Sequence, residues 1–353
     1  MSYRVKLTDQ PRSFEVHAHE TMLDAAIRSG VVLNYGCSSG TCGLCLTRVI
    51  TGQVEEIKPR EFVLSEAHKL QGYVLACVTS PRQDCQIEAI SSQHPADIPE
   101  QTIQVKVRKL ERISREVHRL VVQTPRTKRL RFLAGQYVKL AVASHGSCHL
   151  SIASCPCEDR LIEFHMRIPS TGSAPQDFIN TIHVGDHMLM TGPYGGFVFQ
   201  EQLARPIILF AFDIGFGAIK SLLEHITAQE RTPDIRLIWM ACGEGGLYLH
   251  NLCRAWTDAF DGFEYTGIIL QQSPQELTAQ AKLSCQMVEK HLTAAMGVEQ
   301  DLSRHDIYIC SPAPAVALFE KICAQKNYNR ERFFVEPVRG SYDLSCMVMQ
   351  QQA

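Results

Sequence analysis

The sequence lacks the features that mark a membrane or secreted protein. Its longest unbroken apolar runs are short, such as "IILFAF" from Ile207 to Phe212, whereas about 20 apolar residues are needed to span a bilayer. The opening residues "MSYRVKLTDQ" have no apolar core of the kind a secretory signal requires. We therefore expect no membrane span, and a cytoplasmic location, where free thiols persist.

A surplus of positive charge is also missing. The 35 Lys and Arg residues are balanced by 37 Asp and Glu residues, which leaves a formal net charge of −2. The densest basic stretch, from Lys106 to Arg131, alternates with apolar residues, as the solvated face of a strand does. We expect no nucleic-acid partner, because binding to a phosphate backbone requires a basic surface.

Cysteine, in contrast, is abundant, with 14 residues. Most lie singly among apolar residues, where free thiols act as small core residues, and we interpret Cys85 in this way. Cys37, Cys42 and Cys45 instead share the glycine-rich stretch "GCSSGTCGLC", and Cys77 follows later in a strand-like run. The C-x4-C-x2-C spacing with a distant fourth cysteine is that of plant-type [2Fe–2S] sites. Four-cysteine zinc sites, the weaker alternative, usually show two close pairs.

The chain is long enough for two or three domains. Its patterns divide it into residues 1–92, a polar linker over 93–101, a region of short strands over 102–202, a region of alternating strands and helices over 203–340, and a tail over 341–353. Regular short strands indicate a barrel or a sandwich. Alternating strands and helices indicate a parallel α/β sheet that binds ligands at the carboxyl ends of its strands.

Residues 1–92, with "LDAAIRSGVVLNYGCSSGTCGLC" and "GYVLACV", resemble a plant-type ferredoxin. The resemblance implies a β-grasp fold in which Cys37, Cys42, Cys45 and Cys77 hold the iron. The remainder, with "FLAGQYVKL", "LSIASCP" and "LMTGPYGGF", resembles the ferredoxin–NADP reductase superfamily. That resemblance implies an antiparallel flavin-type β-barrel followed by a parallel α/β nucleotide-binding domain, so that the whole chain is a multidomain α+β and α/β protein.

The whole chain is similar to the reductase components of bacterial oxygenases and to reductases of deoxysugar pathways. In such proteins electrons pass from NAD(P)H to FAD and then singly through the cluster to a partner protein. The implied residues are, for FAD, Gln136, Tyr137, Ser151, Gly172 and Gly192; for the nicotinamide cofactor, Gly215 and Glu244; and, as the catalytic residue beside the nicotinamide, Cys310. Glu244 at the end of a strand favours NADH over NADPH, because it offers an acceptor to a ribose hydroxyl.

Several positions depart from the family pattern. Cys148 and Leu150 replace an arginine and a tyrosine of the flavin motif, and His149 is expected to face away from both. Restoring Cys148→Arg and Leu150→Tyr is a discriminating test: a large gain in bound FAD would indicate a decayed flavin site, and full FAD occupancy in the unaltered protein would refute it. Pro175 replaces a phosphate-binding serine, and Ser311 replaces a glycine. Asp213 stands in the turn that would admit pyrophosphate, where we expect it to cap the following helix.

Three hypotheses follow. The first is an NADH-dependent iron–sulfur flavoprotein reductase that supplies an electron-acceptor protein such as an oxygenase component. The second is an electron carrier or complex subunit that keeps the cluster, while its reductase half has lost NAD(P)H binding and, in the extreme case, FAD binding as well. The third is a reductase acting on a deoxysugar intermediate.

Overall fold

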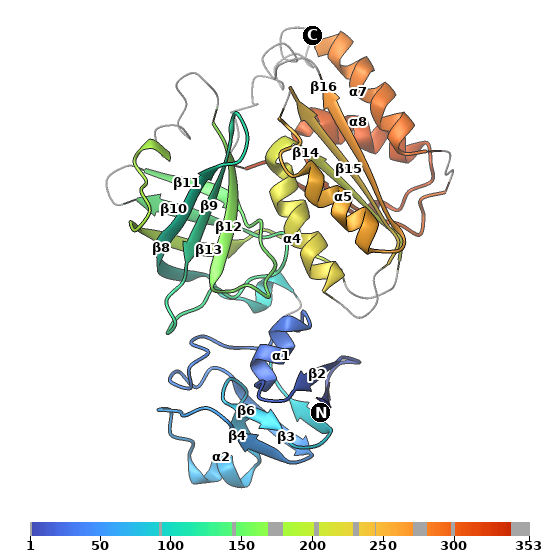
Figure 1. Cartoon of the computed structure of the whole chain (residues 1–353). Helices are drawn as coiled ribbons and strands as arrows, with labels where there is room; N and C mark the ends of the chain where they lie inside the picture. The colour runs from blue at the N-terminus through green and yellow to red at the C-terminus, as the bar shows by residue number, and fades with distance from the viewer. Residues whose placement is uncertain are drawn as a thin grey trace.

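The structure is a computed structural model that describes residues 2–91, 94–142, 146–168, 179–200, 205–228, 233–243, 245–270, 281–297 and 301–339. Gly172, Pro175, Glu244 and the tail over 341–353 lie outside the described residues. Figure 1 shows three bodies in chain order: a small N-terminal unit, a unit of antiparallel strands, and a unit with helices on both faces of a sheet. No helix of the described ranges is long and apolar enough to cross a membrane.

The N-terminal unit is a mixed sheet with one helix packed on it, with strand order β2-β1-β7-β3-β5 and a separate β4-β6 pair. Helix α1 (Met22–Arg28) begins at Thr21, whose side chain accepts a hydrogen bond from the Asp24 N–H. It buries Met22 and Leu23 against the sheet. The other elements are β1 (Ser2–Leu7), β2 (Ser13–His17), β3 (Leu46–Thr51), β4 (Val54–Glu56), α2 (Glu66–Leu70), β5 (Tyr73–Leu75), β6 (Thr79–Pro81) and β7 (Cys85–Glu88).

The second unit is a six-stranded sheet in the order β11-β10-β13-β8-β9-β12, preceded by the 3-10 turn η1 (Pro95–Asp97). An antiparallel bridge between Ile152 and Phe164 joins its two edges, so the sheet curls into a barrel. Inward residues such as Val105, Leu140 and Met190 form one apolar core. The strands are β8 (Gln101–Arg112), β9 (Val117–Gln123), β10 (Tyr137–Val142), β11 (Gly146–Ser151), β12 (Leu161–Arg167) and β13 (His187–Tyr194).

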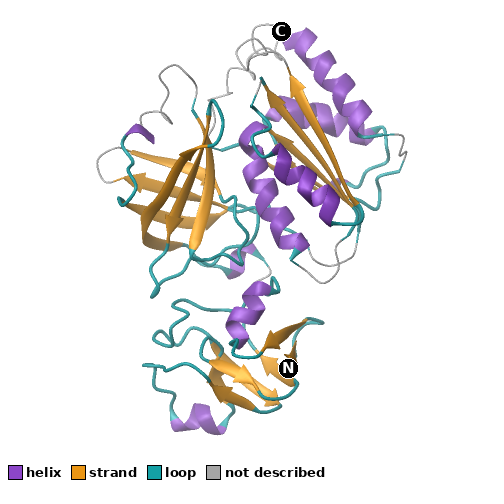
Figure 2. Ribbon diagram, viewed as in Figure 1, coloured by secondary structure: helices purple, strands orange, loops and turns teal. Residues whose placement is uncertain are grey.

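The third unit is a sheet whose described strand pairs are all parallel, in the order β16-β15-β14-β17-β18. Alternate residues of β14 pack into separate cores on its two faces, which explains its continuous apolar sequence. Helices α4 and α5 cover one face, and α7 and α8 cover the other (Figure 2). The elements are β14 (Ile207–Phe212), η2 (Asp213–Gly215), α4 (Phe216–Thr227), β15 (Ile235–Cys242), α5 (His250–Ala259), β16 (Phe263–Leu270), α7 (Ala281–Ala295), β17 (Asp306–Cys310), α8 (Ala313–Ala324), η3 (Arg330–Arg332) and β18 (Phe333–Glu336).

Candidate functional site

The loop that carries three cysteines wraps its backbone N–H groups around sulfur. The N–H groups of Ser39, Thr41 and Cys42 each lie 3.4 Å from the Cys37 sulfur. Gly43 has φ +76°, and a Cβ there would lie 2.3 Å from the Phe62 ring. Only glycine fits this tightly folded backbone, which presents the donors that a sulfur-ligated cluster needs.

The four thiols lie as two pairs that interact electrostatically. The Cys45 and Cys77 sulfurs are 3.2 Å apart, held by a hydrogen bond from the Ala76 N–H to the Cys45 carbonyl at 3.0 Å. Cys42 lies beside Cys37, and both affect the pKa of Cys45. Two pairs of thiols match the ligand set of a cluster of two irons, each taking two cysteines.

The surroundings of Cys37 favour the ionised thiolate, which is the state that metal ligation requires. Burial raises its pKa, but hydrogen bonds from Thr41 and Ser39 outweigh burial and lower the pKa of Cys37 to about 5. Cys37, Cys45 and Cys77 are buried, whereas Cys42 is exposed. The Cys42 side of the loop is therefore the side that another protein can approach.

The segment just before Cys37 is fixed against the barrel by buried polar contacts. The Tyr35 hydroxyl donates to Asp159 at 2.9 Å, and the Arg129 guanidinium lies 3.4 Å from the same carboxylate. The Arg129 N–H also donates to the Gly36 carbonyl at 2.8 Å. Burial raises the pKa of both Tyr35 and Asp159. The segment before the cysteine loop and the barrel are thus joined by a largely buried triad of Tyr35, Asp159 and Arg129.

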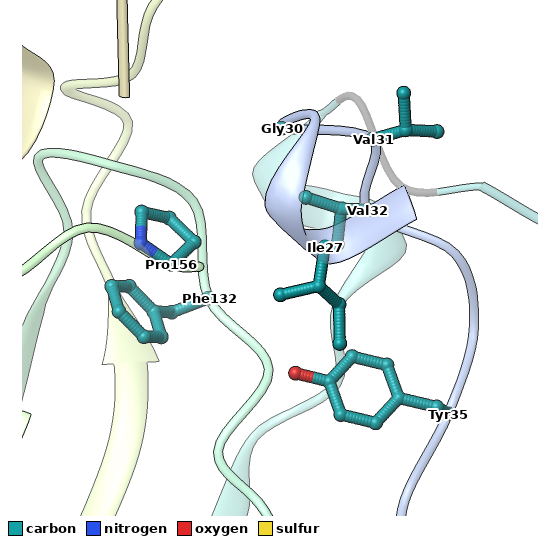
Figure 3. A pocket seen from close by; sticks show the side chains of 7 residues that line it. All are labelled: Ile27, Gly30, Val31, Val32, Tyr35, Phe132 and Pro156. Atoms are coloured by element: carbon teal, nitrogen blue, oxygen red, sulfur yellow. The ribbon is translucent and has the colours of Figure 1, made fainter. Parts of the chain in front are cut away.

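An apolar seam runs beside this triad. Figure 3 shows a small pocket between α1 and the barrel, with Ile27 and Tyr35 facing Phe132 and Pro156. Close in sequence to Arg129 and Tyr35, the Arg131 guanidinium donates a hydrogen bond to the side-chain carbonyl of Asn34. The N-terminal unit therefore contacts the barrel through matched apolar and polar groups.

The turn after α1 also reaches the third unit, at a buried histidine whose burial predicts a pH effect. A Cβ on Gly30 would lie 2.9 Å from the His225 ring of α4. Burial, assisted by Arg12, lowers the pKa of His225 to about 4 from its ordinary value of 6.5. Between these values the unfolded chain binds a proton that folded His225 refuses, so the free energy of unfolding should fall by about 1 to 2 kcal/mol from pH 7 to pH 5.

Urea denaturation at pH 7 and pH 5 measures this fall. A His225→Gln variant should lose this part of the pH dependence, whatever its absolute stability. An unchanged slope in the variant would show that His225 is not the responsible group.

The open face of the barrel carries a cluster of aromatic rings. The Tyr137 ring centroid lies 5.8 Å from that of His149 and 5.5 Å from that of Tyr194. The strand alternation predicted that His149 faces away from Cys148 and Leu150, and it does. However, Leu150 is fully buried in the barrel core and Cys148 packs against it. An arginine or tyrosine at positions 148 and 150 would start from the core side of the strand. The effect of these replacements on FAD binding stays a prediction, and His149 is the residue of this strand that lies beside Tyr137.

The other residues expected to line a flavin site are placed as follows. The Gln136 side-chain amide is buried, and its hydrogen bonds are made within the protein. It accepts from the Leu133 N–H and donates to the Gly195 carbonyl. Gly192 packs against Val138, where a Cβ would lie 3.0 Å from a methyl group. The Ser151 hydroxyl is buried without a hydrogen-bond partner in the described part of the chain. A buried hydroxyl of this kind is what a bound ligand would satisfy.

At the carboxyl ends of the parallel strands, Gly215 and Cys310 come into contact. A Cβ on Gly215 would lie 2.4 Å from the Cys310 carbonyl oxygen, so no other residue fits. Cys310 is fully buried, and burial raises its pKa far above the ordinary value. Its register partner on β18 is Glu336, which pairs with Arg339. Arg339 in turn lies 3.5 Å over the Tyr137 ring, so the two units meet at these residues. The sequence analysis did not identify Glu336 as part of this contact between the two units.

Asp213 does not cap the helix as predicted. Helix α4 has Gly215 at its N-cap and no side-chain cap bond, while the Asp213 carboxylate pairs with Arg167 of the barrel. Burial raises the pKa of Asp213, and Arg167 opposes this. The turn expected to receive a pyrophosphate therefore holds an internal ion pair between Arg167 and Asp213.

Comparisons with known families agree with this division. Residues 5–82 match the family described as "2Fe-2S iron-sulfur cluster binding domain". Residues 104–199 match the "Oxidoreductase FAD-binding domain". The chain therefore combines an iron–sulfur ferredoxin domain with a flavin-binding oxidoreductase domain.

Curated relatives match nearly the full length. The chain is 26% identical over 327 residues to "Propane 2-monooxygenase, reductase component" of Gordonia sp. (strain TY-5), covering 91% of this chain and 93% of the relative. It is 26% identical over 343 residues to "Phenol 2-monooxygenase, reductase component DmpP" of Pseudomonas sp. (strain CF600), covering 95% of each. A dehydrase reductase of Yersinia pestis, "CDP-6-deoxy-L-threo-D-glycero-4-hexulose-3-dehydrase reductase", is 26% identical and covers 76% of this chain and 80% of the relative.

Solved structures share the fold. Amycolatopsis cytochrome P450 reductase GcoB superposes with a TM-score of 0.56 at 21% identity, covering 96% of this chain and 99% of the other. Phthalate dioxygenase reductase superposes with a TM-score of 0.53 at 17% identity, covering 67% and 68%. These structures show the fold that the chain shares with them. The family matches give the class: a [2Fe–2S] cluster-binding domain joined to a flavin-binding oxidoreductase domain.

Proposed function

We propose that this chain is a reductase component that passes electrons from NADH through FAD and a [2Fe–2S] cluster to an oxygenase or similar acceptor protein. The observation that carries the proposal is the largely buried contact between the segment that leads into the cysteine loop and the flavin-type barrel, through Tyr35, Asp159 and Arg129. A carrier ferredoxin acting alone would not need this contact. The cytoplasmic location expected from the free thiols is part of the proposal.

The proposed cluster ligands are Cys37, Cys42, Cys45 and Cys77. The paired thiols and the N–H groups directed at sulfur support this assignment. Exposed Cys42 and the half-exposed Leu44 beside it offer an edge where an acceptor protein could dock. Docking there would bring an acceptor close to the cluster without separating the ferredoxin domain from the barrel.

The proposed flavin site is the aromatic face of Tyr137, His149 and Tyr194 together with the Ser151 hydroxyl. Rings on this face could stack on a planar ligand, and the unpartnered hydroxyl could hydrogen-bond to it. FAD, when bound, supplies the conversion of a two-electron hydride donor into single electrons. Gln136 would hold the adjoining loop, and Gly192 would let the strand pass closely. Gly172 is proposed from the resemblance alone.

Flavin analysis tests the proposal directly. Protein purified without air and then denatured should release about one FAD per chain, as the family chemistry requires. NADH added anaerobically to the intact protein should bleach the visible absorption of the cluster. Absence of both flavin and bleaching would reject the reductase assignment.

A second candidate is an electron carrier that keeps the cluster but not the NAD(P)H site. The Arg167–Asp213 ion pair favours it, because it fills the turn expected to bind pyrophosphate. A protein with full cluster and FAD content, but with no reduction by NADH, would support this candidate. A role in deoxysugar chemistry has weaker support, since the Yersinia pestis relative matches less of the chain.

A further inference from the structure

The turn after β14 contains an ion pair that spans the ligand-binding edge of the parallel sheet. We propose that the Asp213 carboxylate occupies the position where the α/β domain would otherwise bind a phosphate, and that its ion pair with Arg167 keeps it there. A dinucleotide phosphate would then bind there only in competition with Asp213. This inference rests on the proposed function only in taking a dinucleotide as the competing ligand.

The geometry places both charges across the edge of the sheet. Asp213 directly follows β14 with φ +55°, and its carboxylate accepts from the Arg167 guanidinium. Arg167 extends from the end of β12 in the barrel, and its Nη2 lies 3.5 Å from the Cys242 carbonyl at the end of β15. Both residues are at least 95% buried, with exposures of 4% and 5%. The pair therefore bridges the ends of two adjacent parallel strands.

These are the donors that a phosphate would use. Ligands of open parallel sheets bind beyond the carboxyl ends of the strands, where helix N-termini present N–H groups to anions. Here α4 begins at Gly215 without a side-chain cap, and the cation at this edge, Arg167, is already paired with Asp213.

An independent feature indicates that a ligand belongs at this edge. The Ser311 hydroxyl, only 1% exposed, has no hydrogen-bond partner within the described ranges. It follows Cys310, which contacts Gly215 at the start of α4. A buried hydroxyl without a partner is unfavourable unless something else satisfies it.

Removing the Asp213 carboxylate does not leave the buried Arg167 guanidinium without an acidic partner. Glu116 also binds Arg167, with its carboxylate 2.7 Å from Nη2. Replacing Asp213 therefore leaves Arg167 paired with Glu116 and removes the carboxylate that competes with a ligand anion. Asparagine and glycine both tolerate the positive φ at this position, so both replacements preserve the backbone.

The experiment measures binding of ADP, a diphosphate probe that carries no electrons, to the full-length protein. Trp239 donates to the Asp213 carbonyl at 3.0 Å, so its fluorescence reports on this turn, and calorimetry gives an independent affinity. Wild type is compared with Asp213→Asn and Asp213→Gly. Asp234→Asn is the matched control, because it removes an exposed carboxylate just before β15, at the opposite ends of the strands.

We expect both Asp213 variants to bind ADP about tenfold to a hundredfold more tightly than wild type, as one freed charge-assisted hydrogen bond allows. The Asp234 variant should match wild type. Equal affinity in all four proteins overturns the proposal. A gain confined to the glycine variant also overturns it, because volume rather than charge would then be the obstacle. FAD and iron content of the same samples test the proposed function separately.

Discussion

Replacing Cys77 with alanine is expected to abolish the iron–sulfur cluster. Cys77 comes from the segment between β5 and β6, is 1% exposed, and has its sulfur 3.2 Å from that of Cys45. Without it, one iron would lack one of its two thiolates, and the remaining ligands could not hold the cluster. Iron and acid-labile sulfide should fall from about two of each per chain to near zero, together with the visible absorption.

The control is Cys85→Ala. Cys85 is another buried cysteine of the same core, on β7 and outside the cysteine loop, so it separates loss of a ligand from loss of core packing. This variant should retain its iron. Iron retained in Cys77→Ala, or lost equally in both variants, would contradict the proposed ligand set. A colourless wild-type protein that contains zinc would contradict the cluster itself.

Replacing Asp159 with alanine is expected to disconnect the cluster from the flavin barrel. The change leaves the buried Tyr35 hydroxyl and the Arg129 guanidinium without their shared acceptor. Each unsatisfied group costs about 1 to 3 kcal/mol, which is sufficient to reduce the docked population by about tenfold to a hundredfold. Since electron transfer slows steeply with distance, transfer to the cluster should fall accordingly.

Two activities distinguish this effect from a damaged flavin site. Reduction of cytochrome c through the cluster should fall by about tenfold or more, as the lost contacts imply. Reduction of a small dye directly by the flavin should be unchanged. Asp186→Ala removes an exposed barrel carboxylate that accepts from the His183 N–H, and should affect neither. A parallel loss of both activities in Asp159→Ala would argue against a docking role.

Local patterns predicted those elements whose cause is local. Helix α1 has a Thr21 cap and a Gly30 stop close together in the sequence, and the strands of the barrel repeat with clear turns. Helix α2 was not predicted, because it is short and buries no residue. The strand and helix patterns predicted a barrel or sandwich and a parallel α/β sheet, while the β-grasp came from the family resemblance. The solved structures share this fold.

Strand alternation was informative but incomplete. It placed His149 opposite Cys148 and Leu150, yet alternation cannot tell which of two faces is the core. That depends on closure of the barrel by Ile152 and Phe164, which puts Leu150 inside and His149 beside Tyr137. The candidate flavin contact therefore became visible only in three dimensions.

By itself, the sequence determined the cluster motif, because an iron–sulfur loop must carry its thiols and glycines at fixed short spacings. Only the tertiary structure decided how that loop meets the rest of the chain. Tyr35 and Asp159 are 124 residues apart, and Arg167 and Asp213 are 46 apart. No periodicity links such residues. They interact because packing of whole domains removes them from water, and buried charges then require partners.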